Sequence, residues 1–161
     1  MRSSHSPAVL EHRRLDFPPR PGGGCVSGGL DFTRRVLTDW HLSRHRAADE
    51  AGLVVAELLA NAAEHAGGPL ALDLQRRRGR LRIAVTDASP APPRPSRHHR
   101  PEVPRGHGLV IVDRIAADWG CLPDLTGKTV WAELPLPPAA DPDPGRARRA
   151  ALADPDPLFD A

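Results

Sequence analysis

The sequence has only two cysteines, and they lie far apart. Neither Cys25 nor Cys121 belongs to a CxxC pair or has a histidine-rich neighbourhood. The chain therefore offers neither a disulfide framework nor a zinc-binding pattern. This cysteine usage fits a reducing compartment, and we expect a cytoplasmic protein.

Long apolar runs are also missing. The first residues, MRSSHSPAVLEHRR, contain no apolar core of a secretory signal. No stretch approaches the roughly 18 apolar residues of a membrane-spanning helix. We therefore expect a protein that is not exported and has no membrane partner.

The chain has little excess charge of either sign. It carries 22 basic and 20 acidic residues, which gives a formal net charge of +2. Scattered arginines without interleaved aromatic residues do not predict a nucleic-acid partner. Lys128 is the only lysine beside many arginines, alanines and prolines. Because this bias is typical of a GC-rich genome, the abundance of arginine says little about function.

The length of 161 residues fits one domain. Residues 1–11 are polar, and residues 137–161 are rich in proline, alanine and aspartate. Neither end has enough large apolar side chains to offset the entropy of ordering. We expect disordered ends around one ordered domain of residues 12–136.

Hydrophobic patterns within that domain predict helices and antiparallel strands. Residues 12–17 fit an edge strand, which a turn-rich proline and glycine stretch follows. The expected helices are 31–42, capped by Asp31 or Thr33; 47–65, ended by Gly67-Gly68-Pro69; and one containing Leu109, Val112, Ala116 and Trp119. The expected hairpins join 70–75 to 80–87 and 119–122 to 128–134.

Helices and strands in this order do not alternate strictly. Such an order favours an α+β two-layer sandwich, with a mostly antiparallel sheet covered on one face by helices.

Three polar residues share one sector of the expected helix 47–65. Glu57, Asn61 and Glu64 follow one another at spacings of four and three, which brings them to one face. The sector can be the wet side of an amphipathic helix or part of a binding site. The helix alone leaves both interpretations open.

Asp87 ends the expected strand 80–87 and runs into Ser89-Pro90. A carboxylate at such a strand end can accept the exocyclic amine of a purine. It can equally begin a turn by bonding nearby backbone.

Gly106 and Gly108 come directly before the expected third helix. Bare backbone amides at the positive end of a helix dipole can bind an anion such as a polyphosphate, although the same pair can form a tight turn. The basic loop 89–105, which ends on Arg105, can be a lid over phosphates or a solvated surface loop. Gly127-Lys128-Thr129 lies on a hairpin and lacks the leading glycine of a P-loop.

Four segments in this order and spacing resemble the GHKL (Bergerat) ATP-binding fold of histidine kinases, DNA gyrase and heat-shock chaperones. They are AELLANAAEHAGG, VTDASPAP, RGHGLVIVDRIAADWG and GKTVWAEL. Within that fold the sequence is most similar to the anti-sigma-factor serine kinase branch of actinomycetes. The resemblance covers roughly residues 12–136.

The resemblance implies a role for each matching residue. Asn61 would be the magnesium ligand, and Glu57 would be the general base. Asp87 would bond the adenine amino group, and Thr129 would join it through water. The residues implied to lie at the phosphates are Arg105, Gly106 and Gly108.

The implied function is that of an Mg-ATP-dependent serine/threonine protein kinase. It would act as an anti-sigma factor and phosphorylate an antagonist protein, so the implied partners are a sigma factor, that antagonist and a second copy of the chain. The family often has a glycine two residues after the aspartate, whereas here that position is Ser89, followed at once by Pro90. A non-catalytic, ATP-gated binding module therefore stays an alternative. A histidine-kinase catalytic domain is favoured less, because only about 30 polar, glycine-rich residues precede the expected first helix.

Overall fold

A computed structural model describes residues 9–19, 23–91 and 108–137 of the chain. Its elements are β1 (Val9–Asp16), α1 (Cys25–Asp39), α2 (Arg46–His65), β2 (Pro69–Arg77), β3 (Arg80–Asp87), α3 (Gly108–Ile115), β4 (Asp118–Pro123) and β5 (Lys128–Pro135). The strands form one five-stranded sheet in the order β1-β2-β3-β5-β4, and every neighbouring pair is antiparallel.

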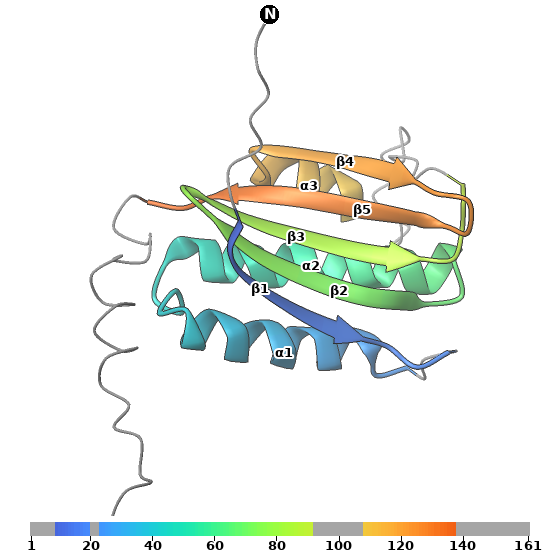
Figure 1. Ribbon diagram of the computed structural model, residues 1–161, viewed down its shortest axis with the longest axis horizontal. Coiled ribbons are helices and arrows are strands. Elements are labelled where there is room, and N and C mark those ends of the chain that lie inside the picture. The colour runs from blue at the N-terminus through green and yellow to red at the C-terminus, as the bar shows by residue number, and fades with distance from the viewer. Residues whose placement is uncertain (1–8, 20–22, 92–107, 138–161) are drawn as a thin grey trace, which may run out of the picture.

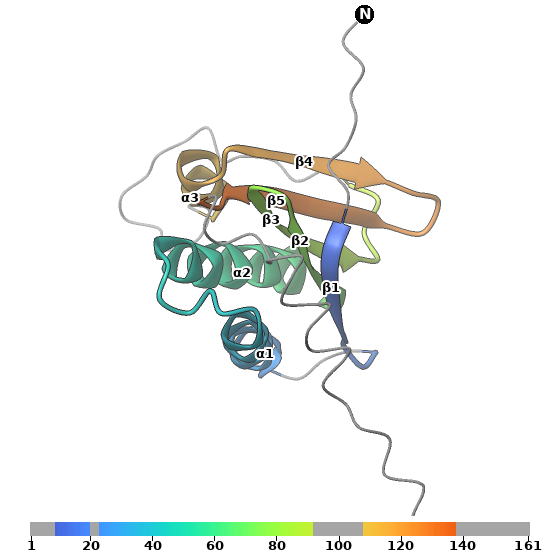
Figure 2. The same ribbon diagram turned by 60° about the vertical axis from the view of Figure 1, so that its left-hand side comes forward.

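The three helices lie on one face of this sheet (Figures 1 and 2). α2 packs against β2, β3 and β5, while α1 and α3 both contact α2. This arrangement confirms the predicted α+β two-layer sandwich. No helix in the described part of the chain is long and apolar enough to cross a bilayer.

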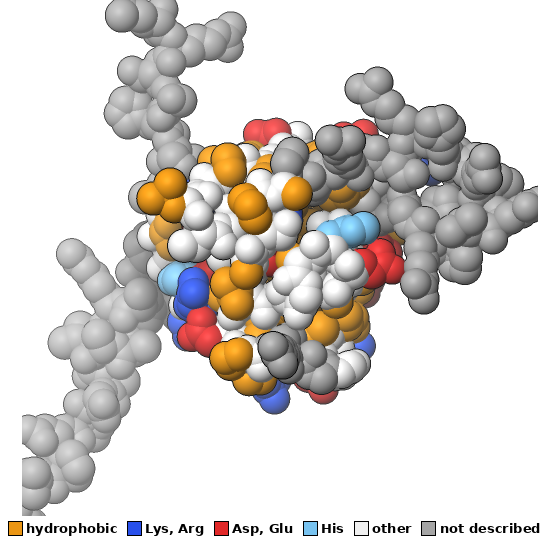
Figure 3. Space-filling view, turned by 90° about the vertical axis from the view of Figure 1, so that its right-hand side faces the viewer, with side chains coloured by type: hydrophobic (Ala, Val, Ile, Leu, Met, Phe, Trp, Pro, Cys, Tyr) orange, Lys and Arg blue, Asp and Glu red, His pale blue; other side chains and the backbone are white. Residues whose placement is uncertain are grey.

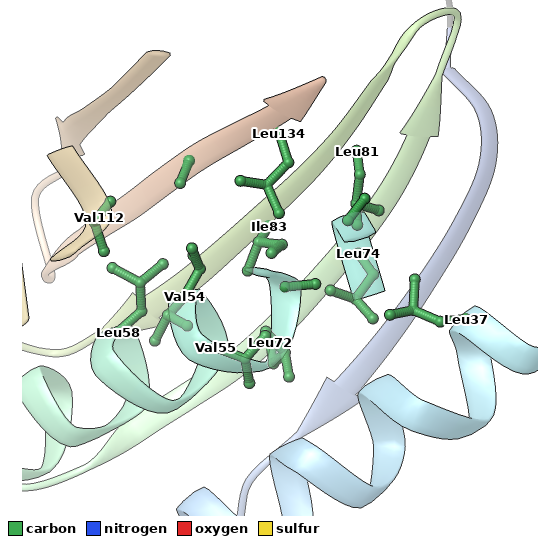
Figure 4. Packing of buried hydrophobic residues seen from close by; sticks show 14 of the residues in the cluster. Leu37, Val54, Val55, Leu58, Leu72, Leu74, Leu81, Ile83, Val112 and Leu134 are labelled. Carbon is green, nitrogen blue, oxygen red and sulfur yellow. The ribbon is translucent and has the colours of Figure 1, made fainter. Parts of the chain in front are cut away.

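α2 is apolar in several directions because it has neighbours on several sides. Val54, Val55, Leu58 and Leu59 are each at most 1% exposed. They meet core side chains of the sheet, including Leu72 and Ile83 (Figure 4). Burial of each such side chain contributes about 1.5–3 kcal/mol. As predicted, α2 ends at His65, where Gly67 and Gly68 adopt positive φ angles.

α1 begins at Cys25, several residues before the expected helix start. The prediction that Asp31 or Thr33 caps this helix is wrong, because both lie inside it. Asp31 pairs with Arg34, and the Thr33 hydroxyl donates to the carbonyl of Gly29. A Cβ atom at Gly29 would collide with Leu59 Cδ1 on α2. This glycine therefore permits a close helix–helix contact and does not form a turn.

The N-terminal strand also begins earlier than expected. Val9 and Glu11 pair with Arg77 and Arg76 of β2, so residues 9–11 belong to the sheet and not to a disordered end. The rest of the expected disordered ends, residues 1–8 and 138–161, lies outside the described residues. So does most of the loop 89–105.

α3 ends at Ile115, one turn earlier than its apolar spacing predicted. Trp119 belongs to β4, where its indole Nε1 donates to Asp113 Oδ1 at 2.9 Å. Trp119 is only partly buried against the core, whereas Trp40 is 2% exposed. Trp40 is thus buried more deeply in the core than Trp119.

The sheet face without helices carries an arginine stacked on a tryptophan ring. The Arg82 guanidinium lies 4.0 Å from the centre of the Trp131 ring, and it pairs with Glu133 at 3.0 Å. On β4, Gly120 faces the same indole, and a Cβ atom there would lie 2.9 Å from it. This face is therefore ordered by cation–π and ion-pair contacts more than by apolar packing.

Candidate functional site

The end of α2, the end of β3 and the start of β5 meet at one end of the sheet. α2 ends at His65, and Pro69, the first residue of β2, pairs with Asp87, the last residue of β3. Lys128, the first residue of β5, pairs with Asp87 from the other side. This is the right-hand end in Figure 1. Figure 3 looks onto it and shows acidic and histidine side chains beside hydrophobic ones.

Asp87 is buried, with 1% of its surface exposed. Its Oδ1 atom accepts from the backbone N–H of Ser89 at 2.9 Å and from Lys128 Nζ at 3.0 Å. The first bond is the turn-forming contact that the sequence offered as one interpretation. No bond to Oδ2 is found among the described residues, so this oxygen can still accept from a ligand. Asp87 can thus shape the turn and bind an amine together.

Lys128 is the residue at this end that the sequence interpretation left without a role. It is 2% exposed, and its Nζ donates to Asp87 Oδ1 and, at 3.2 Å, to the carbonyl of Ser89. The opposite charges offset each other's burial cost. Strand alternation could have placed Lys128, because Val130, Ala132 and Leu134 on the same face are core residues.

Thr129 lies on the opposite face of the sheet from Lys128. Its hydroxyl is hydrogen-bonded to the Thr86 hydroxyl at 2.9 Å on the face without helices. Successive residues of a strand point to opposite faces, so Thr129 and Asp87 are separated by the sheet. The structure does not bring Thr129 to Asp87, and the implied contact through water does not fit this geometry.

Glu57 and Asn61 lie one turn apart on α2, and both are half-buried. Neither side chain has a hydrogen-bond partner among the residues that the structure describes. Glu64, on the next turn, is more exposed and lies 3.8 Å from His65. Glu57 and Asn61 therefore offer a carboxylate and an amide oxygen to an external group, in the C-terminal half of α2.

The donor set fits a magnesium ion that is held mainly by a nucleotide. The Asn61 amide oxygen is a hard ligand, and Mg²⁺ usually takes only one or two protein ligands plus phosphate oxygens and water. Groups of three His, Cys, Asp or Glu side chains able to hold a metal do not occur in the described ranges 9–19, 23–91 and 108–137. A site that needs few protein ligands is thus the kind that these residues can form.

Gly108 opens α3, whereas Arg105 and Gly106 lie outside the described residues. α3 leads into β4, whose first residue pairs with Glu133, far along β5 from Lys128. The C-terminal end of α3 therefore lies away from Asp87, and its N-terminal end faces back toward it (Figure 1). The N–H groups of the first turn of α3 and the positive end of its dipole can then receive an anion.

The turn before β5 fits closely against the end of β3. A Cβ atom at Gly127 would collide with the carbonyl oxygen of Asp87. The turn is fixed by Asp124, whose Oδ1 accepts from the N–H groups of Thr126 and Gly127 at 2.7 and 2.8 Å. Gly127-Lys128-Thr129 therefore belongs to a hairpin, as predicted, and not to a phosphate-binding loop before a helix.

Two hollows lined by described residues lie elsewhere. One of about 690 Å³ lies between α1 and α2, and its lining includes Leu30, Leu37 and Leu53. The other, of about 460 Å³, includes Glu50 and Ile115. Neither is lined by a predicted site residue, so the candidate site rests on the side chains at Asp87 and on α2.

The chain matches the family model of the histidine kinase-like ATPase domain over residues 27–133, more than half of its length. The match includes α2, Asp87, Gly108 and Lys128, and it leaves out β1. Among curated proteins, no relative matches the chain significantly. On the family match, the chain belongs to the GHKL-type, histidine kinase-like ATPases, a family of ATP-binding domains.

Proposed function

We propose that this protein binds Mg-ATP and acts as a serine/threonine protein kinase of the anti-sigma-factor type. The observation that carries the proposal is the buried Asp87 carboxylate at the sheet end where α2 ends, with Asn61 and Glu57 on α2 lacking hydrogen-bond partners among the described residues. A sigma factor and its antagonist as partners, a homodimer and a cytoplasmic location complete the proposal. These last elements are supported by the sequence resemblance alone.

Each residue has a defined task in this proposal. Asp87 Oδ2 accepts from the adenine amino group, and its burial makes that bond selective, because a base without a donor would leave the acceptor unpaired. Asn61 holds the magnesium ion, and Gly106, Gly108 and Arg105 bind phosphate oxygens. The bound Mg-ATP supplies the phosphoryl group.

Glu57 takes the proton from the serine hydroxyl of the protein substrate. It lies one helical turn before Asn61, so a hydroxyl bound beside the nucleotide can reach it. Phosphoryl transfer depends mainly on positioning and on neutralising charge, and a positioned base adds about 10²–10⁴-fold.

Calorimetric titration of ATP with and without magnesium tests the nucleotide site. Asn61→Ala should weaken binding only when magnesium is present, and Asp87→Asn should weaken it in both conditions. Glu64→Gln, on the exposed next turn of α2, is the matched control and should bind as the wild type does. Failure of the wild-type protein to bind ATP would overturn the proposal.

Phosphate transfer is tested with candidate antagonist proteins and mass spectrometry of phosphoserine. Glu57→Gln should lower the transfer rate by about 10²–10⁴-fold with ATP affinity retained, whereas Glu64→Gln should not. Full activity of Glu57→Gln would show that Glu57 is not the base.

A non-catalytic, ATP-gated binding module is the second candidate function. The observation that favours it is a pair of hydrogen bonds at Ser89. Its backbone N–H donates to Asp87 Oδ1, and its carbonyl accepts from Lys128 Nζ. These two bonds hold the backbone at Ser89, directly after β3. A glycine at this position would leave the backbone more conformational freedom. ATP-dependent partner binding without phosphoserine would identify this function.

A further inference from the structure

The Lys128 ammonium has one hydrogen that its contacts with the described residues do not use. An ammonium has three N–H donors. Two of them are directed to Asp87 Oδ1 at 3.0 Å and to the Ser89 carbonyl at 3.2 Å. Since Lys128 is 2% exposed, water has little access to the third. The two existing bonds also fix the position of Nζ beside the carboxylate.

We propose that Lys128 is a specificity-determining residue that reads the purine base together with Asp87. Its third hydrogen donates to adenine N1, while Asp87 Oδ2 accepts from the neighbouring 6-amino group. This inference rests on the proposed function, because it assumes that the base binds at Asp87.

The chemistry of the pair matches one edge of adenine. Adenine presents a donor, the 6-amino group, next to an acceptor, N1. The protein presents an acceptor, Asp87 Oδ2, next to a donor, Lys128 Nζ, on paired residues of β3 and β5. Because both protein groups are buried, a base that leaves either of them unpaired binds more weakly.

The surroundings keep the ammonium in place without a ligand. Asp87 supplies the opposite charge, and the pairing of Asp87 with Lys128 holds the start of β5 against the end of β3. On the neighbouring strand β4, burial raises the pKa of Cys121, and the charges of Lys128 and Asp87 act on it with opposite signs. The donor is therefore already positioned before the base binds, which lowers the entropic cost of recognition.

The test compares ATP with two analogues on the full-length wild-type protein in magnesium. In 1-deaza-ATP a C–H replaces N1, and in purine riboside triphosphate the 6-amino group is missing. Each analogue should bind about tenfold more weakly than ATP, the loss expected for one hydrogen bond to a charged group. Calorimetry or competition with a fluorescent ATP analogue measures these ratios.

The variant Lys128→Met tests whether Lys128 itself donates to adenine N1 or whether a water molecule does so. It should bind ATP about tenfold more weakly than the wild type and should bind 1-deaza-ATP as well as ATP. Thr86→Val, which changes the opposite sheet face, is the control and should keep the wild-type ratio. Circular dichroism establishes that each variant is folded.

Two results would overturn the inference. One is equal affinity of the wild type for ATP and 1-deaza-ATP, which decides the question even if Lys128→Met does not fold. The other is a folded Lys128→Met that still discriminates tenfold, since another group would then read N1. Both differ from failure of the wild type to bind ATP, which overturns the proposed function itself.

Discussion

At the scale of single residues, the buried pair of Asp87 and Lys128 links folding to binding. Removing a charge from water is costly, and each member of the pair offsets that cost for the other. Their side chains are 1% and 2% exposed, so solvent screens the attraction little. The same atoms that would read a base therefore also stabilise the junction of β3 and β5.

The pair should show strong coupling in stability. Lys128→Met leaves a buried carboxylate without its partner, and Asp87→Asn leaves a buried ammonium, so each should lower the free energy of unfolding by about 3–5 kcal/mol. The double variant should lose clearly less than the sum of the two. Urea unfolding of the four proteins measures this, and simple additivity would contradict a net attraction.

The Cys121 thiol should react slowly with alkylating reagents near neutral pH. Burial raises its pKa; the Lys128 charge partly opposes this shift, and Asp87 adds to it. Since the thiolate is the nucleophile, alkylation should begin at higher pH in the folded protein than in urea. Iodoacetamide labelling of the Cys25→Ser variant at several pH values, followed by mass spectrometry, measures the alkylation rate of Cys121. If the rate depends on pH in the same way in the folded protein and in urea, the pKa of Cys121 is not raised.

At the scale of elements, the contact between α1 and α2 depends on one glycine of a pair. A side chain at Gly29 would meet Leu59, which is fully buried, whereas nothing lies within 4 Å of a Cβ atom at Gly28. The two neighbouring glycines therefore have different roles in the same helix.

Alanine at these two positions should change stability with opposite signs. Gly29→Ala forces a methyl group against the core and should cost about 1–3 kcal/mol. Gly28→Ala only lowers the chain entropy of the unfolded state and should stabilise by up to about 1 kcal/mol. Thermal and urea unfolding of both variants test this. Equal effects of the two substitutions would mean that helix propensity alone decides.

The turn between β4 and β5 should weaken in acid. Backbone and side-chain hydrogen bonds from Thr126, with a further bond from Gly127, lower the pKa of Asp124 below its ordinary value of 3.8. A lowered pKa means that the folded state favours the charged carboxylate. The stabilisation is therefore fully present above the ordinary pKa of 3.8 and is lost as the pH falls through the lowered pKa of the folded state. The stability difference between wild type and Asp124→Ala should therefore shrink in strong acid. A constant difference in urea unfolding from neutral pH to acid would contradict it.

The elements that the sequence predicted well are those with an unbroken pattern. α2 has a long apolar repeat and a glycine stop, and β2 and β3 alternate cleanly, so their bounds were close. The start of α1 was missed because glycine is a helix breaker in isolation, and only the contact with Leu59 explains Gly29 within a helix. The periodicity of apolar residues within one segment does not show how two helices pack against each other, so the helical position of Gly29 could not be predicted from it.

The candidate site was predictable in part for a related reason. Asp87 and Asn61 are placed by the end of a strand and the face of a helix, which the sequence shows. The choice between Lys128 and Thr129 depends on which face of β5 each occupies. Counting back from the core residues Leu134, Ala132 and Val130 gives the answer, but a lysine on a core face contradicts the usual expectation of exposure.

At the scale of the whole molecule, the candidate site joins elements that are distant along the chain. α2 supplies Glu57 and Asn61, β3 supplies Asp87, β5 supplies Lys128, and α3 presents its N-terminal end. A ligand held by all four would connect the helix layer to the sheet.

Mg-ATP should therefore stabilise the domain as one unit. At a free concentration about 100-fold above the dissociation constant, binding to the folded state adds about 2.7 kcal/mol to the free energy of unfolding. Thermal unfolding with Mg-ATP should show one transition at higher temperature, and Asn61→Ala should show a smaller shift at the same concentration. An equal shift in that variant would exclude Asn61 from the metal site.

The three tryptophans occupy three different environments, so the intrinsic fluorescence of the protein can report on three different events. Trp40 is enclosed in the core, Trp119 lies beside α3 with its indole bonded to Asp113, and Trp131 stacks on Arg82 on the face without helices. Emission from Trp40 follows global unfolding, and emission from Trp119 follows movement of α3. Trp131 reports on whatever covers the open face of the sheet. Single-tryptophan variants would resolve nucleotide binding, helix displacement and partner docking as separate fluorescence signals, without an attached dye.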